Sequence, residues 1–492
     1  MPALLAQFDI HVNWWVVLAT ATYLLALLSV PSVLLKRRGQ PQVALSWVLT
    51  LFLLPIVGLF LWWAIGRRYL KRQRRRRTRA AEQVQDALEP LREELPELPL
   101  AEDELFPVKH LPDDMIQGVF PAVRNNAVEL LVDAAAGYPA MEQAIRAARR
   151  HVHVMFYIWE PDSTGRRFRD LLAEKAAEGV EVRVLYDAVG SSSLSRRFMD
   201  PLRSAGGEVG VFSKPNLLSF SPHINFRNHR KLVVVDGGEG FLGGLNIGDQ
   251  HLARWHDTML HVRGPVVDQL QEVFDDDWHF TTGRYLRSLD YFGRWAEACD
   301  ADGNAAPRCG EAICQLVASG PHMTESTTRD AFFAAATQVR QRIYITMPYF
   351  LPDAPLETAL RTAVYRGVDV RVLVPARSDV RLVRLAARSY YPSLLAAGVR
   401  IFEYRDDMVH AKNLVLDDEV SLVGSANMDL RSFRLNFELS CFVKDRPLNA
   451  RLAALFDRNL ARSDEVTLAD LANRSYFTQL AEAAANLLSP LL

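Results

Sequence analysis

One eighteen-residue pattern occurs twice in this chain, in the same register and without a gap. The first copy begins at His229 and reads HRKLVVVDGGEGFLGGLN; the second begins at His410 and reads HAKNLVLDDEVSLVGSAN. The offset of 181 residues is far longer than the period of a solenoid repeat, so it indicates a duplicated domain. A chain of 492 residues is also too long for one ordinary core. The sequence therefore predicts two similar folding units.

The segments that precede the two copies are also alike. Residues 151–187 read HVHVMFYIWEPDSTGRRFRDLLAEKAAEGVEVRVLYD, and residues 341–375 read QRIYITMPYFLPDAPLETALRTAVYRGVDVRVLVP. Each predicts an apolar strand, a turn, an amphipathic helix, a break at Gly179 or Gly367, and a second apolar strand. This βαβ pattern favours an α/β fold with mixed, largely parallel sheets flanked by helices.

Two stretches near the N-terminus are suited to a membrane. Residues 13–35 and 43–65 each run for 23 residues without a formal charge, long enough to cross about 30 Å of hydrocarbon as helices. The seven residues between them, KRRGQPQ, allow only a tight turn. Four tryptophans lie at the ends of these stretches, where headgroups would be. The expected arrangement is a two-helix transmembrane hairpin.

The charges around this hairpin predict its orientation. Three basic residues lie in the turn and nine lie just after the second stretch, in RRYLKRQRRRRTR. The larger cluster is expected to stay inside, which places the rest of the chain in the cytoplasm. A cleaved signal peptide is the alternative for the first stretch, but the chain has no basic segment before it. The arginine run is also suited to contact with anionic lipid headgroups.

Charge and cysteine content narrow the function. Residues 1–79 hold twelve Lys and Arg against one acid, whereas the remainder has 45 basic and 57 acidic residues. A generic nucleic-acid binder needs a basic domain, so this balance of −12 argues against one. The four cysteines form no CxxC pair, which predicts reduced thiols in a cytosol-facing domain. A metal site at Cys309 and Cys314 is the less favoured alternative.

The expected domain organisation follows from these segments. Residues 80–118 are acidic and punctuated by proline, as in a tether between folded parts. The closing segment YFTQLAEAAANLLSPLL has an apolar face that is suited to packing on its own domain or, alternatively, to lipid. The predicted parts are the hairpin with its basic segment (1–79), the tether (80–118), a first domain (119–290), a connector (291–310) and a second domain (311–492).

Strand parity divides the roles within each copy. The β-branched run after Lys231 indicates a strand, and side chains of a strand alternate between its faces. His229 and Lys231 therefore share a face, whereas Asp236 has the opposite parity. The equivalent residues of the second copy are His410, Lys412 and Asp417. Histidine and lysine can thus act on one ligand, and the aspartate is better suited to bracing structure.

Further polar residues repeat at the same offset. Gly243–Gly244 and Gly424–Ser425 indicate a close backbone approach, and each pair is soon followed by an asparagine. The asparagines are Asn246 and Asn427. A carboxylate lies 28 residues after each histidine, as Asp257 in the first half and Glu438 in the second. Each half thus supplies a histidine, a lysine, an amide and a carboxylate.

This set of groups suits chemistry on a phosphodiester. A histidine can attack phosphorus or transfer protons near neutral pH. Lysine and asparagine donate to phosphoryl oxygens, and a carboxylate fixes the tautomer of an imidazole. The alternative is that each His-x-Lys is an unrelated exposed strand end, which the double match makes hard to sustain. His151 and His153 flank an apolar strand and are predicted to be structural, and His223 is predicted to lie in a loop.

The two copies resemble the HxKxxxxD signature of the phospholipase D superfamily. The N-terminal apolar pair, RNHRK before the first strand, GSANMDLRSFRLNFE in the second half, SGP at Ser319–Pro321 and the terminal SPLL are similar to bacterial cardiolipin synthases in particular. The similarity covers almost the whole chain. The resemblance implies two similar domains that share one active site at their interface, with no metal or cofactor.

The resemblance also implies a reaction and a set of site residues. The reaction is phosphatidyl transfer between two phosphatidylglycerol molecules, through a covalent phosphatidyl-histidine, at a bacterial inner membrane. His229 would attack phosphorus, and His410 would protonate the leaving glycerol. The implied catalytic set is His229, Lys231, Asp236, His410, Lys412 and Asp417. The implied phosphate-binding or supporting set is Asn246, Asn427, Ser425, Asp257 and Glu438.

Several alternatives stay open at the level of sequence. Water could replace the lipid acceptor, which would make the chain a membrane phospholipase D that yields phosphatidic acid. Phosphatidylethanolamine could be a donor. A nuclease of the same superfamily is disfavoured by the charge balance, and a membrane scaffold with a decayed site is disfavoured by two intact motifs. Spacing does not indicate which carboxylate pairs with which histidine, and it is silent on oligomeric state.

Overall fold

The computed structural model describes residues 14–38, 41–63, 77–80, 82–84, 98–101, 118–212, 226–286, 288–297, 299, 309–323 and 326–489. The chain forms two compact units, Met1–Arg76 and Arg77–Leu492. We refer to the second unit as the body. The described pieces of the predicted tether belong to the body, where Val84 and Ala101 are fully buried. His223 lies outside the described residues.

The N-terminal unit contains three helices, α1 (Trp14–Lys36), α2 (Pro41–Leu53) and α3 (Pro55–Leu61). By length and composition, α1 can cross a membrane, and it is the one helix of the described chain that can. The second predicted stretch is divided at Leu54, so its prediction as one continuous helix is wrong. The cause is Pro55, which has no N–H and disfavours helical geometry at the residue before it. Apolar residues of all three helices pack together.

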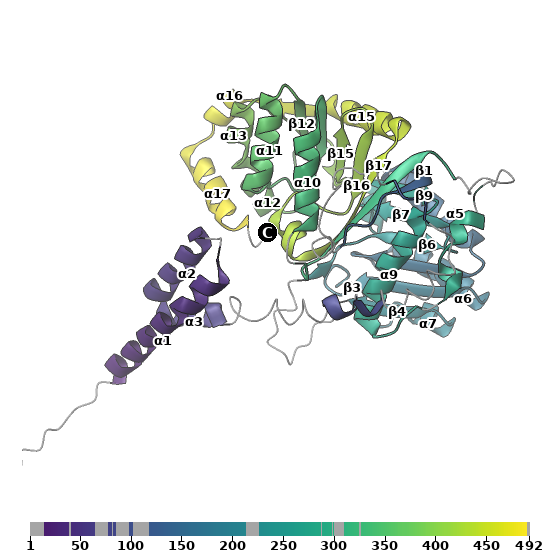
Figure 1. Cartoon of the computed structure of the whole chain (residues 1–492), viewed down its shortest axis with the longest axis horizontal. Coiled ribbons are helices and arrows are strands. Elements are labelled where there is room, and N and C mark those ends of the chain that lie inside the picture. The colour runs from purple at the N-terminus through teal and green to yellow at the C-terminus, as the bar shows by residue number, and fades with distance from the viewer. Residues whose placement is uncertain are drawn as a thin grey trace, which may run out of the picture. The chain divides into compact units, whose positions relative to one another are not determined.

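The body is built on one sheet that runs through both halves, with the same strand order in each (Figure 1). The first half contributes, in sheet order, β4 (Glu208–Phe212), β3 (Glu181–Asp187), β2 (His151–Phe156), β6 (Leu232–Val235), β7 (Glu239–Gly243), β9 (Thr258–Arg263) and β1 (Val123–Val132). The second contributes β13 (Arg400–Tyr404), β12 (Asp369–Pro375), β11 (Arg342–Thr346), β15 (Asn413–Leu416), β16 (Val420–Gly424), β17 (Asn436–Lys444) and β10 (Ala312–Ser319), with β18 (Ser463–Val466) at the outer edge. β1 and β10 pair antiparallel at the centre and join the halves. The predicted duplication is therefore confirmed as two equivalent halves of one mixed sheet.

Most neighbouring strands of this sheet are antiparallel, so the prediction of largely parallel sheets is wrong. Along the sheet order, parallel pairing is confined to β2–β3–β4 and β11–β12–β13, the strands of the predicted βαβ units. Each repeated motif instead forms a hairpin, β6–β7 or β15–β16, and a tight turn can join only antiparallel strands. Asp236 and Asp417 occupy these turns with positive φ angles of 51° and 48°.

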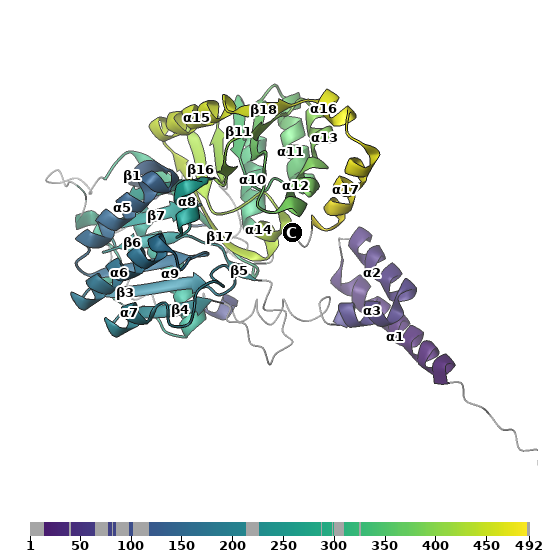
Figure 2. The ribbon, with the colours of Figure 1, turned by 180° about the vertical axis from the view of Figure 1, so that it is seen from behind.

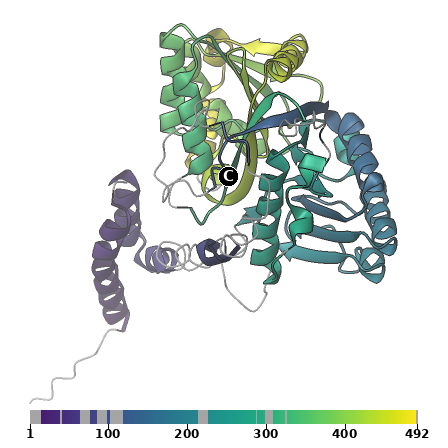
Figure 3. The same ribbon diagram turned by 45° about the vertical axis from the view of Figure 1, so that its right-hand side comes forward.

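Helices cover both faces of the sheet (Figures 2 and 3). On one face, α5 (Asp133–Ala147), α6 (Ser163–Ala177) and α7 (Asp200–Ser204) pack on the first half, and α10 (Thr327–Gln338), α11 (Ala354–Tyr365) and α13 (Tyr391–Ala396) pack on the second. On the other face, α9 (Val266–Thr282) and α15 (Arg446–Leu460) share a single core with strands of both halves. The two halves are therefore packed into one folded unit. The remaining elements are β5 (Arg227–Asn228), α8 (Asp249–Ala253), β8 (Trp255–His256), the 3-10 helices η4 (Leu289–Tyr291) and η5 (Arg294–Glu297), α12 (Arg381–Arg388), β14 (Met408–Val409), α14 (Leu430–Arg434), α16 (Leu468–Ala472) and α17 (Tyr476–Leu487).

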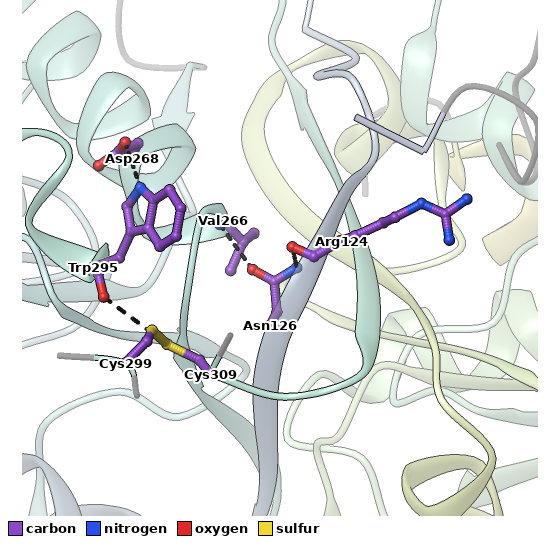
Figure 4. The surroundings of a disulfide bond; sticks show 7 residues. All are labelled: Arg124, Asn126, Val266, Asp268, Trp295, Cys299 and Cys309. Atoms are coloured by element: carbon purple, nitrogen blue, oxygen red, sulfur yellow. Dashed lines mark hydrogen bonds between the residues drawn. A yellow bond between two sulfur atoms is a disulfide. The ribbon is translucent and has the colours of Figure 1, made fainter. Parts of the chain in front are cut away.

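A disulfide closes part of the segment between the halves (Figure 4). Cys299 and Cys309 are bonded, with Cα atoms 4.7 Å apart. Nearby, the indole N–H of Trp295 donates to Asp268 on α9 over 3.0 Å, which holds this segment against the helix. The structure therefore differs from the prediction of four reduced thiols, because it pairs Cys299 with Cys309. Cys314 and Cys441 are free and buried.

Candidate active site

Two short strands carry each half's motif across to the other half. β5, just before His229, pairs in parallel with the start of β17, and β14, just before His410, pairs in parallel with β8. The backbone N–H of His229 donates to the carbonyl of Phe437 over 2.9 Å. The N–H of His410 donates to the carbonyl of His256 over 2.8 Å. Each motif histidine is thus held directly beside the segment that carries the opposite half's carboxylate.

The histidine–carboxylate pairs cross between the halves. Nδ1 of His229 lies 2.9 Å from Oε2 of Glu438, and Nδ1 of His410 lies 2.7 Å from Oδ2 of Asp257. Both carboxylate side chains are completely buried. The pairing that spacing left open is therefore reciprocal, and neither motif histidine pairs with the carboxylate of its own half.

Each carboxylate is fixed by neighbours of its own half. The hydroxyl of Ser425 donates to Oε2 of Glu438 over 2.6 Å, and the amide of Asn436 donates to Oε1 over 3.1 Å. In the first half, Gly244 takes the place of Ser425, and a Cβ there would collide with the carboxylate of Asp257. The sequence predicts Ser425 to bind phosphate or to support another site residue. In the structure its hydroxyl contacts the carboxylate of Glu438, which fits a supporting role.

The two motif lysines are also buried beside the histidines. Nζ of Lys231 donates to the carbonyl of His229 over 2.6 Å. Nζ of Lys412 lies 3.0 Å from Nε2 of His410 and also contacts the carbonyl of that residue. Both side chains are fully inaccessible to solvent. The structure therefore places each motif lysine beside its own histidine, and the charges of both lysines act on His229 and on His410.

Burial and mutual repulsion control the protonation of these groups. Burial lowers the pKa of His229 to about 4, although the charge of Glu438 opposes the shift. Burial, followed by the charges of Lys412 and Lys231, holds the pKa of His410 well below its ordinary value. Burial lowers the pKa of Lys412 to about 8. An anion bound among these groups would favour their protonated, cationic forms, so the site is electrostatically suited to a phosphodiester.

The motif aspartates lie at the far end of their strands from the lysines. The carboxylate of Asp236 accepts the backbone N–H groups of Arg149, Arg150 and His151, each over 2.8 Å. The carboxylate of Asp417 accepts the equivalent three N–H groups of residues 340–342. These contacts anchor each hairpin turn to the start of the neighbouring strand, β2 or β11. The aspartates therefore brace the strands that carry the histidines.

The two motif asparagines each keep one side-chain atom unbonded. Oδ1 of Asn246 accepts the backbone N–H of Ile158 over 3.1 Å, whereas its buried Nδ2 has no partner among the described residues. Oδ1 of Asn427 is likewise buried without a partner in the described chain. A buried polar atom without a partner is costly, so Nδ2 of Asn246 is a candidate donor to an anionic ligand, whereas Oδ1 of Asn427 can only accept a hydrogen bond.

Sequence reasoning missed the aromatic and basic groups around the histidines. The ring of Tyr157 packs edge-on against His229 with centroids 4.8 Å apart, and the ring of Trp255 lies 4.4 Å from that of His410. The available signal was their position, at the end of the first apolar strand and two residues before Asp257.

His151 and His153 are confirmed as core residues, since both are buried and His153 stacks on Phe274.

A buried ionic network also supports the first motif. The guanidinium of Arg230 donates to Asp277 over 2.8 Å and to the carbonyl of Glu438 over 3.1 Å. Asp277 in turn accepts a hydrogen bond from Arg77 over 2.7 Å and another from Asn228 over 2.9 Å. The basic segment that follows the N-terminal helices therefore contributes a buried side chain to the support of the site.

The body has two equivalent halves, and each motif histidine pairs with a carboxylate of the opposite half. Together with the two buried lysines, this arrangement defines a two-domain protein of the phospholipase D-like class. Residues 141–278 and 333–460 match the family model described as cardiolipin synthase, PLD-like domain. A cardiolipin synthase of Alkalihalophilus pseudofirmus is 35% identical over 491 residues, 98% of this chain and 95% of that protein. Cardiolipin synthase A of Pseudomonas entomophila is 41% identical over 381 residues, 76% of this chain and 77% of that protein. The chain belongs to this family of phosphatidyltransferase enzymes.

Similarity to a solved structure supports the fold. The crystal structure of a phosphatidylserine synthase from Haemophilus influenzae Rd KW20 matches 85% of this chain and all of its own, with a TM-score of 0.57 and 15% identity. At that identity the match concerns the fold alone. It agrees with a two-half α/β body.

Proposed function

We propose that this chain transfers a phosphatidyl group between two phosphatidylglycerol molecules and so makes cardiolipin and glycerol. The main structural support for this proposal is the reciprocal pairing of two buried histidines with carboxylates of the opposite half. One site then holds two imidazoles, each oriented through Nδ1, beside two buried lysines. Membership of the cardiolipin synthase family and the apolar helix α1 support a phospholipid substrate.

The first half-reaction forms a covalent intermediate on His229. Nε2 of His229 attacks phosphorus, and the bond from phosphorus to the headgroup oxygen breaks. The departing glycerol takes a proton from His410. Nε2 of His229 is free for this role, because it makes no hydrogen bond within the part of the chain that the structure describes. The lysines and the Nδ2 donors of Asn246 and Asn427 hold the phosphoryl oxygens.

The second half-reaction releases the product. A hydroxyl of the second phosphatidylglycerol gives its proton to His410, and its oxygen attacks phosphorus. The bond between phosphorus and Nε2 of His229 breaks, which leaves cardiolipin and a neutral His229. Glu438 stabilises the positive imidazole of the intermediate, and Asp257 does the same for His410 when it carries the proton. The site returns to its starting state, and no step calls on a metal or a cofactor.

The product distinguishes this reaction from its alternatives. We expect the purified full-length protein, given phosphatidylglycerol labelled in the headgroup glycerol, to release one labelled glycerol for each cardiolipin formed. Chromatography of the lipids and the aqueous phase measures both. Phosphatidic acid as the sole lipid product would replace the transferase with a hydrolase. Cardiolipin formed together with free ethanolamine from a labelled mixture would identify phosphatidylethanolamine as a donor.

We further infer that α1 and the segment α2–α3 form a membrane hairpin, with the body in the cytoplasm of a bacterial cell. The support is the nine basic residues that follow the second apolar stretch, which favour the inner side. The bond between Cys299 and Cys309 opposes this orientation, because disulfides are rare in the cytosol. The proposal therefore requires that the cell keeps this pair reduced and that the bond forms once the protein meets an oxidant.

The redox state of the pair in living cells tests this orientation. We expect a membrane-permeant maleimide, added to intact cells before lysis, to alkylate Cys299 and Cys309, as measured by mass spectrometry of the purified chain. A membrane-impermeant maleimide should label neither. Cys314 and Cys441 are buried and should react with neither reagent until the protein is denatured, which provides an internal control. A pair already bonded in untreated cells would place the body on the oxidising side.

A further inference from the structure

The last described helix, α17, exposes its apolar side chains and buries its charged one. Glu482 and Ala485 are buried, whereas Phe477 is 79% exposed and Leu487 is 82% exposed. A helix on a water-facing surface has the reverse arrangement. The exposed large apolar side chains of α17 and the residue after it are Tyr476, Phe477, Leu480, Leu487 and Leu488. We refer to these five as the α17 face.

An ion-pair network fixes the helix in this orientation. Glu482 forms ion pairs with Arg474, just before α17, and with Arg388 of α12, the latter over 3.4 Å. Ala485 packs in a small core with Val383 and Ala386 of α12. Turning the helix to hide the α17 face would remove a buried carboxylate from both arginines, which is costly. The exposure of the face is therefore built into the packing.

The α17 face is a local concentration of apolar surface. Elsewhere among the described residues of the body, exposed large apolar side chains are scattered over separate elements, namely Leu100, Leu252, Phe333, Tyr365, Val380 and Leu468. Single exposed apolar residues are ordinary, whereas a contiguous group indicates an interaction surface. Tyr476 and Phe477 lie with ring centroids 6.1 Å apart, and such aromatic side chains favour the interface between lipid and water.

The helix α17 is connected through α12 to groups that act on the active site. α17 packs on α12, whose core includes Leu351 and the adjoining Tyr349. The hydroxyl of Tyr349 donates to Asp379 over 2.8 Å. The negative charge of Asp379 in turn acts to raise the pKa of Lys412, which places this set of contacts within electrostatic range of the site.

We propose that the α17 face inserts into the surface of the lipid bilayer and thereby holds the active site against its lipid substrates. A bilayer is the favoured occupant because of the inverted polarity of the helix, its aromatic pair and the membrane-spanning length of α1. The inference also rests on the proposed function, since only an enzyme that acts on lipids gains from being held at a bilayer. A buried apolar face with polar residues turned away is how an amphipathic helix lies in a membrane interface. A second copy of the chain is the rival occupant.

A fluorescent probe on the face tests its location directly. The full-length Leu480→Cys variant is labelled with the polarity-sensitive dye NBD under non-reducing conditions and reconstituted into vesicles of phosphatidylglycerol and phosphatidylcholine. We expect blue-shifted emission that lipids carrying a nitroxide on the acyl chain quench. The matched control is Tyr365→Cys on α11, whose native side chain is also exposed and whose probe should stay unquenched. An unquenched probe at residue 480, or one quenched only by a second labelled copy, would overturn the proposal.

Activity on two forms of substrate separates docking from chemistry. In Phe477→Asp and Leu487→Asp, we expect the rate on bilayer phosphatidylglycerol to fall about tenfold or more, since a charge opposes burial of the face. The rate on a short-chain phosphatidylglycerol dispersed as monomers should match that of the unaltered enzyme, which also shows that the variants fold. Equal losses on both substrates would contradict docking. A lack of cardiolipin from the unaltered enzyme on either substrate would instead refute the proposed function.

Discussion

In the His410→Ala variant, a phosphatidyl ester of p-nitrophenol is expected to release one equivalent of nitrophenolate per enzyme and then stop. This phenol leaves without needing a proton, so the first half-reaction does not require the acid that His410 supplies. The second half-reaction does require a base, and the intermediate on His229 therefore accumulates. In His229→Ala, which lacks the nucleophile, we expect no burst and a rate lower by about 10⁴-fold or more. Rapid-mixing absorbance measures both results.

Two further observations make the assignment of roles decisive. Denaturation of the stalled His410→Ala enzyme in neutral urea, which avoids the acid that cleaves phosphohistidine and the alkali that cleaves acyl esters, should leave the phosphatidyl group on His229, where mass spectrometry would locate it. The control is His261→Ala, because His261 also pairs with a carboxylate, Glu239, over 3.0 Å but lies on β9 outside the site. That variant should retain the burst and turnover. A burst in His229→Ala, with none in His410→Ala, would exchange the two roles.

Much of this site could be predicted from one sequence because duplication acts as an internal alignment. The equal spacing of histidine, lysine, asparagine and carboxylate in both halves singled out the groups that the structure gathers. Strand parity alone separates Asp236 from His229, and the carboxylate of Asp236 accepts hydrogen bonds from backbone N–H groups. The break in the helix at Leu54 could also have been predicted from the sequence, since Pro55 lies in the middle of the second apolar stretch.

The cross-pairing of the carboxylates was not accessible from the sequence. It depends on β5 and β8, each only two residues long, which pair with strands of the opposite half. Strands this short have no periodicity to detect, and their partners are more than 150 residues away. The contact of the Ser425 hydroxyl with Glu438 is closer in sequence, at 13 residues, but it too depends on strand pairing, because it exists only after β16 and β17 pair. Local pattern thus identified the groups, and long-range pairing determined their partners.

The Glu438→Gln variant is expected to lose about 10³- to 10⁴-fold in the rate of the nitrophenolate burst while keeping its fold. Glutamine preserves the shape, but it neither fixes the tautomer of His229 nor stabilises the positive imidazole of the intermediate. Glu438 also acts to raise the pKa of His229, which burial lowers to about 4. Neutral His229 is the attacking form, so the rate is full above this pKa and is lost as the pH falls through it. Removing the negative charge should therefore move the acid limb of kcat/KM to lower pH, a shift that a purely structural defect would not produce.

The Asp257→Asn variant is the matched test for the other histidine, because Oδ2 of Asp257 lies 2.7 Å from Nδ1 of His410. Its burst on the nitrophenyl ester should stay close to that of the unaltered enzyme, whereas its steady turnover with a phosphatidylglycerol acceptor should fall by about 10³-fold or more, since His410 then lacks its orienting partner. Glu438→Asp, which restores a carboxylate at shorter reach, should recover part of the burst. If both amide variants impaired the same half-reaction, the reciprocal pairs would not divide the chemistry. If the two variants impair different half-reactions, the carboxylate of each half orients the catalytic histidine of the opposite half. Neither copy of the motif could then act alone.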